Sequence, residues 1–328
     1  MNPHVKYSIL SGGKATGMAI RWFSAGRSVI MKKLEEMCLL DDFLFNKISA
    51  DENYGKEFAG IILKNVLGRE IRVTKLQAQR LYSGNDSDKR GARMDVVVEE
   101  DTADVLELKP EEAVIYDIEA DNNDKTKDIM VLPKRTRFYH AKMDSDSIKS
   151  GAGFDQLQRT YVIMIMSYDP FDRGRLRYTV RRGCVEDPTI PYDDGSCTIY
   201  LYVHGKPDET DEEGSVELQQ MLHFMENTDR EHAVTPDLKR IQDMVDHIKQ
   251  SREAQQEAMK IYEREQMLKE EGREEGREEE RANTEREKKR ADAAEKEANE
   301  ARLEVQRLSA EVENLQSLLE EKGILDQM

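Results

Sequence analysis

The chain has 328 residues, of which 36% are charged and 38% hydrophobic, with a mean hydropathy of -0.77. No run approaches the roughly 18 apolar residues that span a bilayer, which excludes an integral membrane protein. The first 30 residues lack the apolar stretch of a secretory signal, and the 3 cysteines provide no disulfide framework, which favours a cytoplasmic location. Because the net charge is -17, DNA contact would require a locally basic face.

Charge density and apolar spacing divide the chain into three parts. Residues 1–30 hold short Gly, Ser and Ala stretches without a sustained period. We expect them to be poorly ordered, or to be a misassigned upstream extension that precedes a natural start at Met31. Residues 31–230 alternate helix and strand patterns at ordinary core density. Residues 231–328 are polar, and they are predicted to form nearly continuous helix.

The middle part carries a recognisable order of elements. Apolar residues three and four apart from Phe58 onward predict a helix that stops at Gly68, and Pro133 suits the start of a helix over 132–150. The continuous apolar run over 160–167 favours a strand that is buried on both faces. The expected strands are 93–100, 112–121, 160–167, 177–182 and 197–205. This order predicts an α/β fold in which helices flank a central sheet.

The tail contains a strict spacing of three and four residues. It comprises Ala291, Ala294, Ala298, Ala301, Val305, Leu308, Val312, Leu315 and Leu319. Valine at a positions and leucine at d positions favour a parallel two-stranded coiled coil, so we expect a homodimer through about 291–322. The alternative is a lone helix that packs on its own domain, although its remaining surface is highly charged.

Acidic residues mark the first two strands of the middle part. Asp95 lies early in the first strand, whereas Asp117, Glu119 and Asp121 share one face of the second. Three acids on one face of an otherwise apolar strand are costly unless a cation neutralises them, and Mg²⁺ takes carboxylate oxygens as ligands. The alternative is an exposed strand end, where such acids are solvated.

The order helix, strand with Asp, strand with Glu, helix resembles the PD-(D/E)XK nuclease superfamily. More specifically, the chain resembles the branch described as PD-(D/E)XK nuclease family transposases, which includes recombination-promoting nucleases. The segments that carry the resemblance are CLLDDFLFNKI (38–48), RMDVVVEE (93–100), YDIEAD (116–121), LPKRTRFYHAKMDSD (132–146) and TYVIMIMSYDPFDRG (160–174). The resemblance implies a restriction-endonuclease-like core and a metal-dependent endonuclease that hydrolyses phosphodiester bonds in DNA.

The resemblance also assigns residues to the site. It implies that Asp95 and Glu119 hold Mg²⁺ or another divalent cation such as Mn²⁺ or Ca²⁺. Glu57 would match the acid that the first helix of this superfamily often adds, although it is equally an ordinary helix-surface glutamate. Asp121 departs from the pattern, because the family usually has lysine, and often glutamine, there. Asp121 would then be an extra ligand, or the site would be inactive, unless the next helix replaces the charge through Lys134, Arg135 or Arg137.

A positive face for DNA is expected from basic residues in two segments. They are Lys134, Arg135, Arg137 and Lys142, together with Arg173, Arg175, Arg177, Arg181 and Arg182. Such a face would hold phosphates and carry little sequence information, and its alternative is a surface paired with nearby acids. Two functions therefore compete. One is a DNA endonuclease, and the other, favoured by the acid at position 121, is a degenerate nuclease fold that serves as a coiled-coil assembly module.

Overall fold

The computed structural model describes residues 32–82, 91–100, 113–122, 130–207 and 215–321. The expected extension over 1–30 lies outside these residues. The helices are α1 (Asp42–Ser49), α2 (Gly55–Leu67), α3 (Leu132–Ser147), α4 (Ser215–Glu226), α5 (Pro236–Gln250) and α6 (Arg252–Glu321), with short 3₁₀ turns at Leu34–Glu36 and Phe154–Gln156. None of the described helices is both long and apolar enough to cross a membrane.

Six strands form one mixed sheet in the order β1-β2-β3-β4-β6-β5. They are β1 (Val73–Tyr82), β2 (Ala92–Glu100), β3 (Val114–Asp121), β4 (Arg159–Met166), β5 (Arg177–Val180) and β6 (Ser196–Tyr202). β1, β2 and β3 pair antiparallel, β3, β4 and β6 pair parallel, and β5 is an antiparallel edge strand. The predicted α/β class, with helices flanking a sheet, is confirmed.

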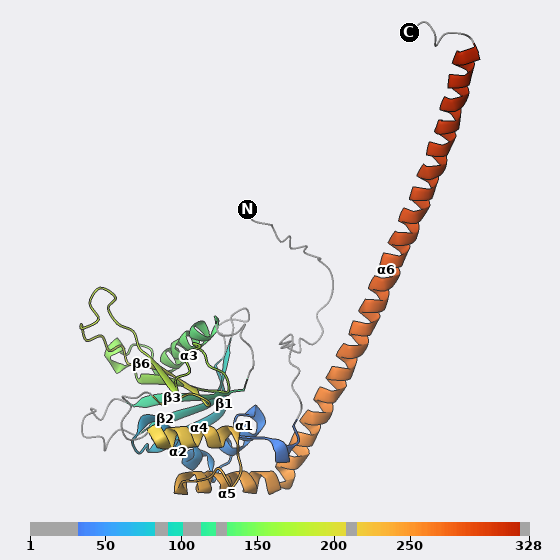
Figure 1. Cartoon of the computed structure of the whole chain (residues 1–328). Helices are drawn as coiled ribbons and strands as arrows, with labels where there is room; N and C mark the ends of the chain where they lie inside the picture. Colours follow the sequence, from blue (N-terminus) through green and yellow to red (C-terminus); the bar gives the residue numbers. More distant parts are fainter. Residues whose placement is uncertain (1–31, 83–90, 101–112, 123–129, 208–214, 322–328) are drawn as a thin grey trace. The chain divides into compact units, whose positions relative to one another are not determined.

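The two faces of the sheet carry separate hydrophobic cores. Helices α1, α2, α4 and α5 cover one face, and α3 covers the other, as Figure 1 shows. Alternate residues of each strand serve the two cores: Ile163 and Ile165 of β4 face the larger one, whereas Val162 and Met164 face α3. β4 lies between β3 and β6 and is almost wholly buried, which confirms the strand predicted to be covered on both faces.

β1 is the strand that the sequence pattern did not predict. Its residues read VTKLQAQRLY, and only the last is fully buried, because β1 is the edge strand beside β2. A polar edge strand lacks the apolar alternation that identifies half-buried strands, and its charged side chains protect the exposed edge from pairing with another chain. The pairing with β2 therefore decides its conformation.

Local signals set several helix ends. Gly68 adopts a left-handed φ of 70° and its N–H caps the end of α2 through the Lys64 carbonyl, as its position predicts. Thr235 caps α5, since its side chain accepts a hydrogen bond from Leu238 N at 3.1 Å. The helix expected to run on from there is interrupted at Ser251, which has an extended conformation. The tail is thus two helices rather than one.

α6 contacts the core only through its beginning. Ala254 and Ala258 are buried, and this end of the helix contacts α5 and the turn at Leu34–Glu36. From residue 263 to residue 319 every side chain is exposed. The long orange-to-red helix of Figure 1 therefore gains little stability from packing within its own chain.

Two buried polar networks tie helices and strands together. Glu100 on β2 is 3% exposed and accepts two hydrogen bonds from Arg69, at 2.5 and 2.8 Å, and one from the Tyr116 hydroxyl at 2.6 Å. On the other face, both ring nitrogens of His140 lie 2.9 Å from threonine hydroxyls, those of Thr160 and Thr198. His140 thereby joins α3 to β4 and β6.

The buried His140 predicts a loss of stability in acid. Burial lowers the pKa of His140 from 6.5 to about 4. Between these two pH values the unfolded chain therefore binds a proton that the native state does not bind. The contribution of neutral His140 to the free energy of unfolding is complete above pH 6.5. It should be lost as the pH falls from 6.5 to 4, by an amount on the order of 3 kcal/mol. Urea unfolding across this range should show a steeper fall for the wild type than for His140→Gln, and equal slopes would contradict the assignment.

Candidate active site

The alternation of side chains along β2 changes face at Asp95. Residues two apart on a regular strand point to one face, yet Met94 packs in the core beneath α3 and Val96 packs in the opposite core. β1 pairs with β2 at Ala78–Val96 and at Arg80–Met94, and Gln79 between these pairs has a left-handed φ of 51°. The register of β2 against β3 ends at the pair Val96 and Ile118. The pairing of β2 with β3 therefore stops at Asp95, where β2 departs from β3.

The side chain of Glu119 fills the gap that this departure opens. Its Oε1 accepts a hydrogen bond from the Asp95 backbone N–H at 2.9 Å, so a carboxylate takes the place of a strand partner. Its Oε2 accepts a hydrogen bond from Arg135 at 2.6 Å. Glu119 is only 2% exposed, so these two bonds compensate part of the cost of taking its charge out of water.

Arg135 comes from the first turn of α3 and reaches across to β3. It forms an ion pair with Glu119 at 2.6 Å and with Asp121 at 2.9 Å, and its Nε donates to the Tyr139 hydroxyl at 2.9 Å. Burial alone would lower the pKa of Arg135, but the surrounding acids hold it above its ordinary value. Arg135 of α3 therefore brings a positive charge to Glu119 and Asp121.

Asp95 is approached from the other side by α1. A side-chain hydrogen bond from Asn46 favours the charged form of Asp95, whereas the negative charge of Asp42 disfavours it. Asp95 is part-exposed, in contrast to Glu119. Glu119 thus contacts the backbone of Asp95 at the gap between β2 and β3, and its charge raises the pKa of Asp95, with α1 on the side of Asp95 and α3 on the side of Glu119.

Asp117 completes the set of acids. It lies on the same strand face as Glu119 and Asp121, and its side chain is 0% exposed. Both of its carboxylate oxygens are buried and have no hydrogen-bond partner among the described residues. Such groups are rare in native structures and call for a specific explanation.

The acids raise one another's pKa values. Burial is the largest cause for Asp95, Asp117 and Glu119, and the neighbouring negative charges add to it. Arg135 acts in the opposite direction on all three, but it is a single cation. The site therefore holds more acidic groups than its own positive charge can neutralise.

The ligand chemistry of the site fits a hard divalent cation. No three His, Cys, Asp or Glu side chains of the described residues are grouped closely enough to form a metal cage. Mg²⁺, however, is typically bound through one or two carboxylates and keeps several waters. The predicted ligands Asp95 and Glu119 offer hard oxygen donors at one gap, and the unpartnered oxygens of Asp117 lie on the same strand face as Glu119.

The other expected acid, Glu57, has a different partner. Its carboxylate forms a two-pronged ion pair with Arg240 of α5, at 2.7 and 2.8 Å, and its side chain is 43% exposed. Its contacts thus agree with a helix-surface glutamate and give no support to a place in the site. Helix α1 instead brings Asp42 and Asn46 to Asp95. Both residues belong to the segment CLLDDFLFNKI (38–48), which precedes the helix that carries Glu57.

The expected basic face is divided by the fold. Lys134 and Arg137 are exposed on α3, and Arg173 and Arg175 are exposed in the loop after β4. This loop begins beside the carboxyl end of β3, where Ser167 N donates to the Asp121 carbonyl at 3.2 Å. By contrast, Arg177 donates to the Val66 carbonyl on the α2 side of the sheet. Arg182 pairs with Asp194, and its charge acts on His140 and Asp144 of α3.

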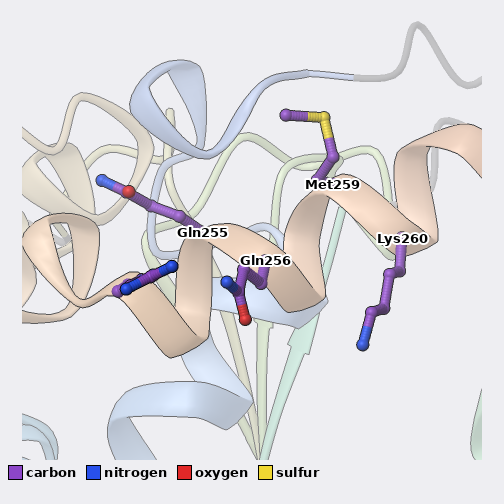
Figure 2. Close-up of a pocket in the computed structure, with 5 residues that line it drawn as sticks. Gln255, Gln256, Met259 and Lys260 are labelled. Carbon is purple, nitrogen blue, oxygen red and sulfur yellow. The ribbon is translucent and has the colours of Figure 1, made fainter.

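Surface hollows lie away from the acids. One is lined by Arg252, Gln255, Gln256, Met259 and Lys260 at the start of α6. Figure 2 shows that its labelled side chains point in different directions and do not converge on a common centre. The other lies beside α4, and its lining includes His204, His223 and His232. Neither contains the residues that the sequence assigns to chemistry.

Comparison with known proteins identifies no relative. No family description, curated protein or solved structure matches the chain.

Removal of the Arg135 guanidinium should destabilise the protein strongly. Glu119 and Asp121 are 2% and 4% exposed, so Arg135→Met would leave two buried carboxylates without their cation. We expect a loss of about 3 kcal/mol or more in the free energy of unfolding, measured with urea at pH 7. Arg137→Met, two residues along the same helix and exposed, is the matched control and should change stability little. Equal effects of the two substitutions would contradict the role given to Arg135.

Proposed function

We propose that this protein is a metal-dependent nuclease that hydrolyses phosphodiester bonds in DNA. The observation that carries the proposal is the hydrogen bond from the Asp95 backbone N–H to the Glu119 carboxylate where β2 departs from β3, with Arg135 held against Glu119 from α3. A carboxylate pair beside a fixed guanidinium combines a cation site with a group that recognises phosphate. The excess of acidic over basic residues in the site also favours the binding of a divalent cation.

In this proposal each residue has a defined task. When bound, Mg²⁺ or Mn²⁺ would polarise the phosphate and activate a water molecule. Asp95 and Glu119 hold that ion. Arg135, whose side chain is 35% exposed, is oriented by Glu119, Asp121 and Tyr139 and presents its outer edge to a phosphate oxygen. Its five N–H donors exceed the three that these bonds use.

The surrounding charges support a nucleic-acid substrate. Lys134 and Arg173 and Arg175 lie at the end of the sheet that carries Asp121, and they are exposed. Contacts of this kind position a backbone without reading its sequence. We therefore infer binding that depends strongly on salt, because each neutralised phosphate releases counterions.

A plasmid-nicking assay tests the nuclease. We expect nicking by the full chain with Mg²⁺ or Mn²⁺, and a loss of about 100-fold or more in Asp95→Asn and Glu119→Gln, which remove ligand charge with little change of shape. Glu99→Gln is the control, because Glu99 lies on β2 but pairs with Lys75 at the surface. Glu57→Gln decides separately whether that acid takes part. Nicking that is independent of metal, or equal in wild type and Asp95→Asn, would refute the proposal.

We propose further that the chain forms a parallel homodimer through α6. The seam over 291–319 lies within one unbroken helix, and its large apolar members remain between 42% and 66% exposed. These members are Val305, Leu308, Val312, Leu315 and Leu319. Each such side chain buried in a dimer contributes about 1.5–3 kcal/mol before the entropy of association is subtracted. A dimer would bring together two cores, each able to act on one strand of a duplex.

Sedimentation tests the homodimer. Replacement of both Leu308 and Leu315 by lysine should abolish the dimer and leave the unfolding of the core unchanged, because neither side chain contacts the described core. The matched control places lysine at two exposed positions outside the seam, Gln306 and Glu313, and should leave the dimer intact. A double Leu308 and Leu315 variant that sediments as the wild type does would show that α6 does not make the interface.

A further inference from the structure

The loop that follows β4 is organised around one carboxylate, that of Asp169. Its Oδ2 accepts hydrogen bonds from the backbone N–H groups of Arg173, at 2.7 Å, and of Gly174. Its Oδ1 accepts the Phe171 N–H at 3.0 Å and the Tyr178 hydroxyl at 2.8 Å. Burial alone would raise the pKa of Asp169, but these four donors hold it below its ordinary value. The carboxylate is therefore ionised at neutral pH and fixes the backbone of the loop.

Aromatic side chains join the same loop to the sheet. The ring centroid of Phe171 lies 4.9 Å from that of Tyr178 on β5 and 5.3 Å from that of Tyr200 on β6, both in edge-on contacts. The Tyr178 hydroxyl, which donates to Asp169, also accepts the Arg175 N–H at 3.1 Å. The loop is thus fixed at several points, although residues 171–175 are exposed.

The segment after β6 brings another cation to this loop. Arg175 and Lys206 form a parallel bridge, so their backbones lie side by side. The Lys206 N–H donates to the Gly174 carbonyl, and the Lys206 carbonyl accepts the Leu176 N–H, both at 2.8 Å. A Cβ atom at Gly205 would lie 2.4 Å from the Arg175 carbonyl oxygen, so this close approach requires glycine.

The two segments carry three exposed cations at the end of the sheet that holds the candidate site. The cations are Arg173, Arg175 and Lys206. The exposed acid beside them in the loop is Asp172. The loop begins next to the site, because the Tyr168 hydroxyl donates to Asp121 Oδ2 at 3.4 Å. Positive charge on a fixed backbone therefore lies beside the proposed reaction centre.

We propose that Asp169 is a positioning residue that holds this loop as a contact for the phosphate backbone of duplex DNA, and that Lys206 joins Arg173 and Arg175 in that contact. The inference rests on the nuclease proposed above and names the surface through which it would hold its substrate. Cations of this kind bind phosphates without reading sequence. Because Asp169 orders the backbone before DNA arrives, binding need not supply the entropy cost of ordering the loop.

Removal of the Asp169 carboxylate tests the positioning role through the direction of its effect. Loss of an acid beside a DNA-binding surface should by charge alone strengthen binding. We expect Asp169→Ala instead to weaken the binding of a fluorescent DNA duplex at least about 5-fold, because the loop is no longer ordered. The affinity is measured by fluorescence anisotropy on the full chain in EDTA, which prevents metal-dependent cleavage. Asp169→Asn, whose amide oxygen still accepts hydrogen bonds, should recover part of the affinity.

Asp187→Ala is the matched control for Asp169→Ala. Asp187 also accepts a backbone N–H in an exposed loop, that of Thr189 at 3.0 Å, and its loss should not weaken binding. Should Asp169→Ala not fold, the exposed cations decide. Arg173→Gln and Lys206→Gln should each weaken binding and reduce the slope of log affinity against log salt by about 1. Lys239→Gln, at an exposed position on α5, should change neither.

The outcomes separate this inference from the nuclease proposal. A folded Asp169→Ala variant that binds the duplex as tightly as the wild type or more tightly would overturn the inference. Unchanged affinity in both Arg173→Gln and Lys206→Gln, or no binding by the wild type, would overturn it too. If binding depends on Asp169 but plasmid is not cut, the inference stands and the nuclease proposal fails. If plasmid is cut and Asp169→Ala binds as the wild type does, the nuclease proposal stands and the loop is not the contact.

Discussion

The carboxylate of Glu119 is the group on which the arrangement of the site depends. One of its oxygens accepts the Asp95 backbone N–H, and the other accepts the guanidinium of Arg135. β2, β3 and α3 are therefore joined through a single buried side chain. Because a carboxylate out of water must have partners, the position of Glu119 requires both the departure of β2 and the approach of α3.

This arrangement concentrates charge in a small volume. Asp117 and Asp121 share the strand face of Glu119, and the backbone N–H of Asp95 on β2 donates to Glu119, whereas Arg135 pairs with Glu119 and Asp121. Structural ion pairs normally balance their charges, since unpaired buried ions are costly. An excess of buried carboxylates is instead typical of functional sites, and it is the reason for the metal site proposed above.

The departure from the motif at position 121 takes on a different meaning in three dimensions. An aspartate cannot supply the positive charge that lysine would bring to that position. Arg135 supplies one instead, 14 residues later in the chain, and Asp121 helps to orient it through a bond of 2.9 Å. The acid at position 121, read alone, favours a degenerate site. In the folded chain Asp121 pairs with Arg135 and helps to hold its guanidinium in place.

The sequence by itself determined the α/β class, most strands and helices, and the heptad seam of α6, because these follow from local periodicity and from signals such as Gly68. It also identified Asp95, Glu119 and Asp121 as chemically unusual, since acids on an apolar strand face break its pattern. Edge strand β1 was missed, because pairing with β2 and not its own composition makes it a strand.

Only the tertiary structure decided which charges meet. It brought Arg135 to Glu119, placed Asp42 and Asn46 of α1 beside Asp95, and buried Asp117 on the strand face of Glu119. It also paired Glu57 with Arg240 and placed Arg177 on the α2 side of the sheet, away from Lys134 and Arg137 of α3. Local patterns report the period and burial of a segment. They carry no information on which distant side chain satisfies a buried charge, because that depends on where the packing of helices against the sheet places the partner.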